Sequence, residues 1–152
     1  MTITDPPRTP EQRRREVLER LERETDVWVA TADAEGAPCM VALWFVWDGE
    51  AVWVSTRATN PTGRNLREQG RARLALGDTR DVVLIDGAAE AFTAREVPDA
   101  AVEAFLAKTG WDPRAERAAY AFFRVRPRAV QAWHGVRELP QRHLMKEGKW
   151  LV

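Results

Sequence analysis

The sequence predicts a mostly β protein, a small antiparallel barrel with short helices between its strands. Short runs in which apolar residues alternate with others recur along the chain, and clusters of Gly, Pro, Asn and Asp separate them. Runs of helical period are interspersed among these strands and are not gathered into one block. Gly87 stands inside the longest predicted strand, where it allows a bulge or a bend such as a barrel corner needs. Many short strands with helices between them favour a barrel.

Composition narrows the class of protein further. With 152 residues, of which 45% are hydrophobic, the chain can build one core, so we expect a loose tail at 1–8 and a single domain over 9–152. The 23 basic and 23 acidic residues cancel, which argues against a nucleic-acid partner. Because the sequence has no apolar run long enough to span a bilayer and no secretion signal at its start, we expect a cytoplasmic protein without a membrane partner.

The first expected element is a helix from Pro10 to about Glu24, capped by Thr9. Its few large apolar residues fall on one narrow stripe, so it should lie on a body formed by the rest of the chain. A short helix follows the third strand, and a longer one runs from Pro98 to near Gly110. Strands are expected at residues 27–32, 40–47, 51–56, 71–77, 82–92, 120–126 and 129–133, with Pro127 between the last two.

The strand at 40–47 is apolar on both faces. A strand needs this only if one face meets the core and the other meets a helix, a ligand or another subunit. Tryptophans at strand spacing, Trp28 among them, are more often core residues than ligand platforms. Trp44 is the exception, because it is a candidate wall for a groove that binds a flat ring.

The third strand leads into the short helix through a hydroxyl-rich turn, over residues 54–66, that has the features of an anion-binding site. Asn60 can cap the helix, and Pro61 suits its first position. The free N–H groups that follow lie at the positive end of the helix dipole, where a phosphate is stabilised. Hydroxyl and guanidinium donors surround this place: Ser55, Thr56, Thr59, Arg57 and Arg64. The alternative is an ordinary loop with two solvated arginines, and the residues alone favour neither.

No other cluster in the sequence carries a clear chemistry. The acidic residues lack the spacing of a catalytic pair, so no catalytic residue is assigned. His134 and His143 are too few and too far apart in sequence for a zinc site, so no metal is expected. Cys39 opens a strand without a neighbouring histidine and should be a small buried apolar side chain.

The order of these segments resembles that of the FMN-binding split-barrel superfamily, which includes pyridoxamine 5'-phosphate oxidase-like proteins and deazaflavin-dependent oxidoreductases. The resemblance lies in the first hairpin, the second turn, the anion-binding turn and two later segments, at residues 30–38, 44–49, 55–66, 108–112 and 126–133. The two later segments are similar to parts of the deazaflavin-dependent branch. No single motif is unique to this superfamily, so the resemblance rests on the order and spacing of the motifs.

This resemblance implies a homodimer of six-stranded antiparallel split β-barrels that binds FMN or a deazaflavin (coenzyme F-420) at the dimer interface. The residues expected to bind the cofactor are Trp44, Ser55, Thr56, Arg57, Thr62, Arg64 and Asn65. Family members usually carry a lysine where this chain has Thr62, and many oxidases carry arginine where it has Pro61. Three explanations stay open: Arg57 or Arg64 replaces the missing cation, phosphate affinity is weak, or the site has been lost.

The function that follows is an oxidoreductase that transfers hydride between the bound cofactor and a small organic substrate. Two alternatives stay open, namely a protein that binds a flavin or tetrapyrrole without turnover and a dimer with a degenerate cofactor site. In the C-terminal segment, Trp133, Arg142 and Trp150 are candidates for closing the partner's site, as related barrels imply. Their alternative role is in a terminal strand packed on the barrel.

Overall fold

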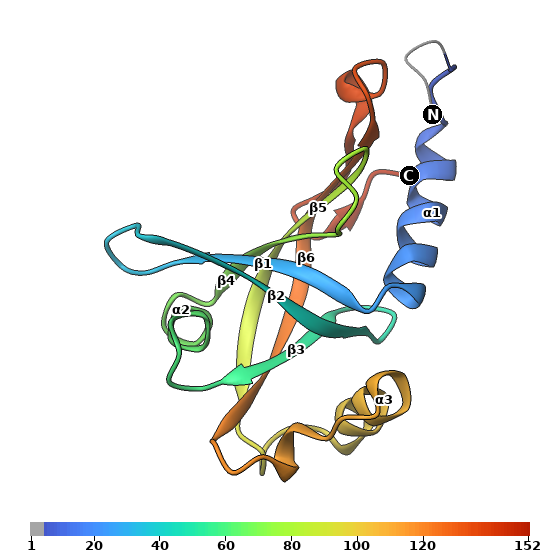
Figure 1. The fold of residues 1–152 in the computed structure, drawn as a ribbon. Helices are drawn as coiled ribbons and strands as arrows, with labels where there is room; N and C mark the ends of the chain where they lie inside the picture. The colour runs from blue at the N-terminus through green and yellow to red at the C-terminus, as the bar shows by residue number, and fades with distance from the viewer. Residues whose placement is uncertain (1–4) are drawn as a thin grey trace.

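The computed structural model describes residues 5–152, which form β-strands around a central core with helices at the edges (Figure 1). The helices are α1 (Pro10–Arg23), α2 (Pro61–Gln69) and α3 (Asp99–Thr109). The strands are β1 (Asp26–Ala32), β2 (Pro38–Trp47), β3 (Val52–Arg57), β4 (Arg71–Ala75), β5 (Asp81–Phe92), β6 (Tyr120–His134), β7 (His143–Lys146) and β8 (Lys149–Trp150). Short 3-10 turns at Pro113–Ala115 and Leu139–Gln141 complete the described chain.

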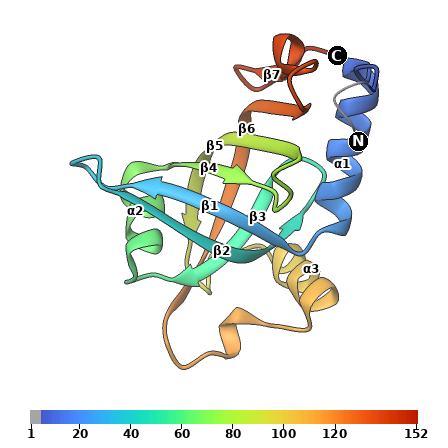
Figure 2. The same ribbon diagram turned by 45° about the horizontal axis from the view of Figure 1, so that its top comes forward.

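Six of the strands close into an antiparallel barrel, as the sequence predicted. Their order is β3-β2-β1-β4-β5-β6, and β3 pairs with β6 to close the ring. The remaining two strands form a small hairpin beyond the barrel, in which β7 pairs with the end of β6 and β8 pairs with β7 (Figure 2). The fold prediction is therefore confirmed for a single chain.

One strand assignment was wrong, because residues 120–126 and 129–133 belong to the single strand β6. Pro127 pairs with Gly87 and Ala129 pairs with Asp86, so Arg128 is an extra residue in β6. This bulge explains the error: a proline has no N–H to donate, and a bulge lets the strand pass through it without ending.

Gly87 permits this arrangement because it lets β5 and β6 approach closely. A Cβ atom at Gly87 would lie 2.5 Å from Cγ1 of Val125 and 2.8 Å from the carbonyl oxygen of Arg126. Any side chain at this position would force the two strands apart. Of the two alternatives expected at Gly87, a bulge or a bend, the structure has a bulge.

The barrel is split where β2 and β3 separate. These strands pair only from Phe45↔Val54 to Trp47↔Val52, whereas β3 pairs with β6 along its whole length. Beyond this short pairing α2 packs against β1, β2 and β5 and places Leu66 in the main core (Figure 1). The split therefore brings the predicted anion-binding turn to the edge of the barrel.

The helices α1 and α3 cover other parts of the barrel. Helix α3 buries Phe105 against Val46, Trp53 and Phe122 in a second core cluster on the outer side of the sheet. Helix α1 lies along the opposite side of the barrel from α2 (Figure 2). This agrees with the expectation that the helix packs on the rest of the chain, and Val17 and Leu21 join the main core.

A buried group of charges holds α1 to the C-terminal part of the chain. Arg8 is buried, and its guanidinium donates a hydrogen bond to Glu138, with Nη2 2.8 Å from Oε1. Arg13 donates to the carbonyl oxygens of Ala132 (3.0 Å) and Gln141 (2.7 Å). Of the tail expected at 1–8, residues 1–4 lie outside the described residues, and Arg8 is tied to the barrel by these contacts.

Candidate functional site

The turn from β3 into α2 has the capped form that the sequence predicted. The side-chain oxygen of Asn60 accepts a hydrogen bond from the Gly63 N–H (2.7 Å), and Pro61 occupies the first helical position. Gly63 packs directly on the preceding loop, because a Cβ atom there would lie 2.2 Å from the carbonyl oxygen of Arg57. The start of α2 therefore packs against its own loop, and the Asn60 side chain accepts a hydrogen bond from one of the N–H groups that have no partner within the helix.

The two predicted hydroxyl groups of β3 are used within the fold. Ser55 is buried, and its Oγ donates to the carbonyl oxygen of Ala121 (2.8 Å). Thr56 is also buried, and its Oγ1 accepts a hydrogen bond from the side-chain amide of Asn60 (2.8 Å). Both hydroxyls therefore stabilise the turn and its attachment to β6.

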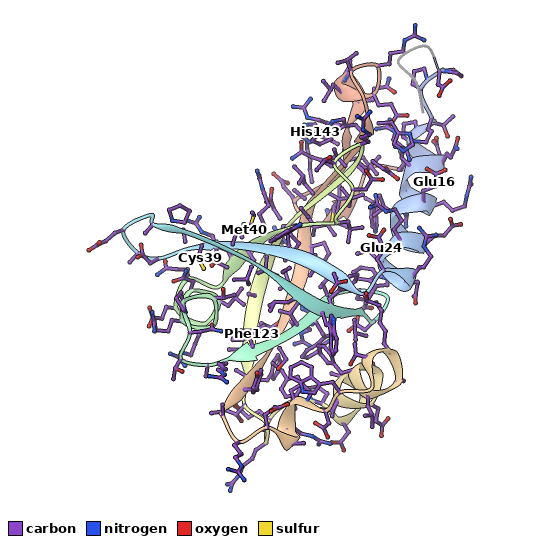
Figure 3. All side chains as sticks on the ribbon, in the orientation of Figure 1. Glu16, Glu24, Cys39, Met40, Phe123 and His143 are labelled. Carbon is purple, nitrogen blue, oxygen red and sulfur yellow. The ribbon has the colours of Figure 1, made fainter. Side chains whose placement is uncertain are left out.

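Thr62 and Asn65 face the barrel interior. Thr62 is only 1% exposed, and its Oγ1 lies 3.5 Å from Sγ of Cys39, the β2 residue beside α2 in Figure 3. The buried amide of Asn65 donates to Oγ1 of Thr31 (3.1 Å). In this chain the position that usually carries the family's lysine thus helps to fasten α2 to β2.

The arginines of the predicted set lie at the surface. Arg57 ends β3, Arg64 stands on the exposed side of α2, and both side chains are exposed. Arg64 donates to the carbonyl oxygen of Thr59, which keeps its guanidinium beside the turn. Of the predicted donors, these two guanidinium groups are the charged ones that a ligand at this edge can reach.

The outer face of the β1–β2 hairpin is apolar and uncovered in the single chain. Trp28 pairs with Ala42 and Ala30 pairs with Met40 in register, so their side chains share one face. We call these four residues, with Trp44, the outer apolar face. Met40 is 62% exposed, Trp44 46% and Trp28 42%. This is the outer side that the doubly apolar strand led us to expect.

Sequence reasoning placed Trp44 at this face but put Trp28 in the core and did not assign Met40. Alternation alone gives two faces to a strand, and the register with β2 decides which face carries Trp28. The pairing of the two strands was the missing information.

Trp44 also meets an aromatic side chain that sequence reasoning missed. Its ring lies edge-on to Trp111, with centroids 6.0 Å apart. Trp111 follows α3 and is itself edge-on to Tyr120 of β6, at 5.3 Å between centroids. A row of three aromatic rings therefore borders the end of the outer apolar face.

A groove of about 540 Å³ adjoins this face on the side of β4 and β5. Its lining includes Ala30 of the outer apolar face, Asp86 and three arginines: Arg71, Arg73 and Arg128. Asp86 pairs with Arg73, with Oδ1 2.6 Å from Nε. Within residues 5–152 the guanidinium groups of Arg71 and Arg128 make no hydrogen bond or ion pair. We call this groove of about 540 Å³ the β4 groove. Its basic lining was not predicted, because the groove joins strands that are distant in sequence.

The C-terminal candidates lie on the chain's own barrel. Arg142 donates to the side chain of Gln131 (3.0 Å) and to the carbonyl oxygen of Leu139 (2.8 Å). Trp150 lies in β8, beneath the guanidinium of Arg14, and Trp133 is half-buried in β6. Contacts of these residues with a partner stay a prediction.

The described residues contain neither a metal-binding cluster nor a helix that could span a membrane. Among residues 5–152 no group of three or more His, Cys, Asp and Glu side chains has the geometry to hold a metal ion. No helix in the same range is long and apolar enough to cross a bilayer.

Comparison with known proteins gives one family match and many structural matches. The model of the pyridoxamine 5'-phosphate oxidase family matches residues 14–134. No curated protein matches the chain in sequence.

Three solved structures illustrate the structural matches. An F-420 reductase is 24% identical with a TM-score of 0.59, and the match covers 74% of this chain and 93% of that one. The heme storage protein of Vibrio cholerae is 17% identical with a TM-score of 0.68, covering 89% and 97%. A conserved hypothetical protein of Mycobacterium tuberculosis is 23% identical with a TM-score of 0.62, covering 79% and 83%. Likeness at these identities establishes a shared fold.

Proposed function

Because the chain belongs to the pyridoxamine 5'-phosphate oxidase family, we propose that it is an oxidoreductase that binds FMN or a deazaflavin, coenzyme F-420. It would transfer hydride between this cofactor and a small organic substrate. The observation that supports the proposal is the outer apolar face, where Trp28, Met40 and Trp44 are exposed. The anion-binding turn adjoins the same strand, because Thr62 contacts Cys39, the neighbour of Met40 in β2. A flat ring with a phosphate-bearing chain has one apolar part and one anionic part, and this edge of the barrel offers a surface for each.

The residues present fit both parts of such a cofactor. Trp44, with Trp111 edge-on to it, gives the ring an aromatic border at the end of β2. Arg57 and Arg64 are exposed at the start of α2 and supply forked donors for phosphate oxygens. The cofactor, when bound, supplies the hydride chemistry. The protein's part is to bind and orient it and to exclude water from the ring.

We propose in addition that the protein is a homodimer in which a second chain covers the outer apolar face. Exposed apolar patches of this kind on a single chain mark surfaces that bind a partner or a ligand. Met40→Glu should then convert the dimer to monomers in sedimentation experiments, because a charge would be buried without a partner. Val136→Glu is the matched control, since Val136 is 65% exposed elsewhere on the molecule. A dimer that survives Met40→Glu would contradict this interface.

A second candidate function is binding of a flavin or tetrapyrrole without turnover. It is favoured by Ser55, Thr56 and Thr62, whose polar groups are engaged inside the fold and leave few donors for a phosphate. The structural match to a heme storage protein points the same way. For a tetrapyrrole the histidines fit poorly, because His134 and His143 lie at the end of β6 and in β7, away from the outer apolar face. A degenerate cofactor site is the remaining alternative.

The experiment that separates these functions is a titration of the purified protein with FMN, coenzyme F-420 and heme, followed by visible absorption and fluorescence. The reduced, bound cofactor is then mixed with candidate acceptors, and its reoxidation is timed. Binding with acceptor-dependent reoxidation supports the oxidoreductase, and binding without it supports the carrier. Failure to bind any of the three ligands would contradict both functions and would support a degenerate cofactor site.

A further inference from the structure

A second groove, of about 630 Å³, lies between α1, β6 and the β7–β8 hairpin. We call it the α1 groove. Two tryptophans and three arginines line it: Trp47, Trp150, Arg14, Arg126 and Arg128. None of these residues belongs to the set expected to bind the flavin-type cofactor. The α1 groove meets the β4 groove at Ala88 and Arg128.

The backbone around Arg128 is arranged to leave its side chain free. Arg128 is the bulged residue of β6, and bulges re-aim the side chain that they carry. Its carbonyl oxygen accepts a hydrogen bond from the Gly148 N–H (2.8 Å). A Cβ atom at Gly148 would lie 2.9 Å from Nη1 of Arg128, so the guanidinium lies against this glycine and would have to shift if a side chain were added there. The φ angle of Gly148 is 76°, which also favours glycine.

The arginines of this groove differ in what they bind. The guanidinium of Arg14 lies 4.6 Å from the centroid of Trp150 and donates to the backbone oxygen of Val152. Arg126 pairs with Glu90 at 3.2 Å. The guanidinium of Arg128 makes no hydrogen bond or ion pair to any described residue. One carboxylate, Glu50, also lines the groove, so cationic groups outnumber anionic ones.

We propose that the α1 groove binds a small planar anion, an aromatic ring that carries a carboxylate, sulfonate or phosphate group. Arg128 receives the anionic group, because a forked guanidinium without a partner can make two parallel charge-assisted hydrogen bonds to it. Trp47 and Trp150, with the apolar side chain of Met145, receive the ring. The volume of the groove lies within the range of about 300–1,000 Å³ that is typical of small-molecule sites.

The test uses naphthalene-2-sulfonate as the probe and follows the indole N–H resonances of the full chain by NMR. We expect saturable shifts of the Trp47 and Trp150 resonances. Naphthalene-2-methanol, which has the ring without the charge, and inorganic sulfate, which has the charge without the ring, should each bind at least about tenfold more weakly. Equal affinity for the uncharged probe, or shifts confined to Trp28 and Trp44, would overturn the proposal.

Variants of the arginine complete the test. Arg128→Gln should weaken binding of the sulfonate about tenfold or more, and Arg128→Lys should recover part of the loss because it keeps the charge. Arg95→Gln, in an exposed loop away from the groove, is the matched control and should leave binding unchanged. Unchanged affinity in Arg128→Gln would refute the site. Because Arg128 is exposed, its variants should unfold at the wild-type temperature, which a melting curve checks.

Discussion

Glu138→Gln should destabilise the folded protein strongly, because Glu138 is the centre of the buried charges that hold α1. Its side chain is 2% exposed. Its carboxylate accepts hydrogen bonds from Nη2 and the backbone N–H of Arg8 and from the backbone N–H of His134, each at 2.8 Å. Arg13 lies 4.0 Å away and is also buried. Glutamine has nearly the same shape as glutamate, but it lacks the charge and would point its NH₂ group, a donor, toward these N–H donors.

The size of the effect follows from the acid strength of this group. Burial alone would raise the pKa of Glu138, but hydrogen bonds from Arg8 and from the His134 N–H outweigh burial and lower the pKa from 4.5 to about 2. At about 1.4 kcal/mol for each pKa unit, this depression corresponds to stabilisation of roughly 3 kcal/mol at neutral pH. Loss of one partner from a buried ion pair costs a similar amount, about 3–5 kcal/mol. We therefore expect the variant to lose about 3 kcal/mol.

The assay is urea unfolding of wild type and variant at several pH values. Because the folded-state pKa of Glu138 is depressed, its stabilisation is present above the ordinary value of 4.5 and is lost as pH falls toward about 2. The difference between wild type and Glu138→Gln should be largest at pH 7 and should shrink steadily below pH 4.5. Glu19→Gln, on the exposed side of α1, is the control and should stay close to wild type. A constant difference at all pH values, or none, would refute the reasoning.

Three further predictions concern the anion-binding turn and a buried lysine. Arg64→Ala should weaken FMN or F-420 binding by about 1.5–3 kcal/mol in a fluorescence titration. Arg67 is also exposed on α2, and Arg67→Ala is the control that should leave the affinity unchanged. Equal losses in the two variants would remove Arg64 from the site. Gly63→Ala should lower the free energy of unfolding by about 1–3 kcal/mol, because its Cβ would lie 2.2 Å from a carbonyl oxygen. Gly77→Ala is the control and should leave the stability nearly unchanged, because a Cβ there would have nothing within 4 Å. Equal urea midpoints for the two variants would contradict this account. Lys108→Met should stabilise the fold by about 1 kcal/mol, because Nζ is buried without a hydrogen-bond partner among the described residues and burial lowers the pKa of this lysine. The gain should shrink as pH rises toward 10.5, the ordinary pKa of lysine, and should vanish above it, where Lys108 is neutral in both the folded and the unfolded chain. A gain that persists above this pH would refute the charge-burial explanation.

The parts of the fold that could be predicted are those set by local sequence. Asn60 and Pro61 start α2 through capping and a fixed φ angle, and both act between near neighbours in the chain. Apolar runs bounded by turn residues likewise gave β1, β2 and β5. Pro127 was misread because its effect depends on a bulge opposite Gly87, a residue in another strand. Local patterns therefore gave the helices and the barrel strands, and pairing between distant segments decided the lengths of those strands.

The candidate site was predicted less completely, for the same reason. Thr62 and Asn65 lie within two residues of exposed Arg64 in sequence, yet the docking of α2 turns them toward Cys39 and Thr31 in the barrel. The β4 groove and the α1 groove share Arg128 and join segments from different parts of the chain. No spacing rule finds such a set before the strand order is known.

The departure from the family pattern at Thr62 is a matter of packing as well as of charge. Thr62 is 1% exposed and touches Cys39, so its side chain fills the contact between α2 and β2. A lysine there would have to carry its ammonium group out past this contact, because a buried cation without a partner is costly. Phosphate binding at this edge therefore rests on Arg57 and Arg64, whose guanidinium groups need no space in the core. If Arg57→Ala and Arg64→Ala each bound the cofactor as tightly as wild type, its phosphate would have to lie elsewhere. The unpaired arginines of the β4 groove, Arg71 and Arg128, would be the next place to test.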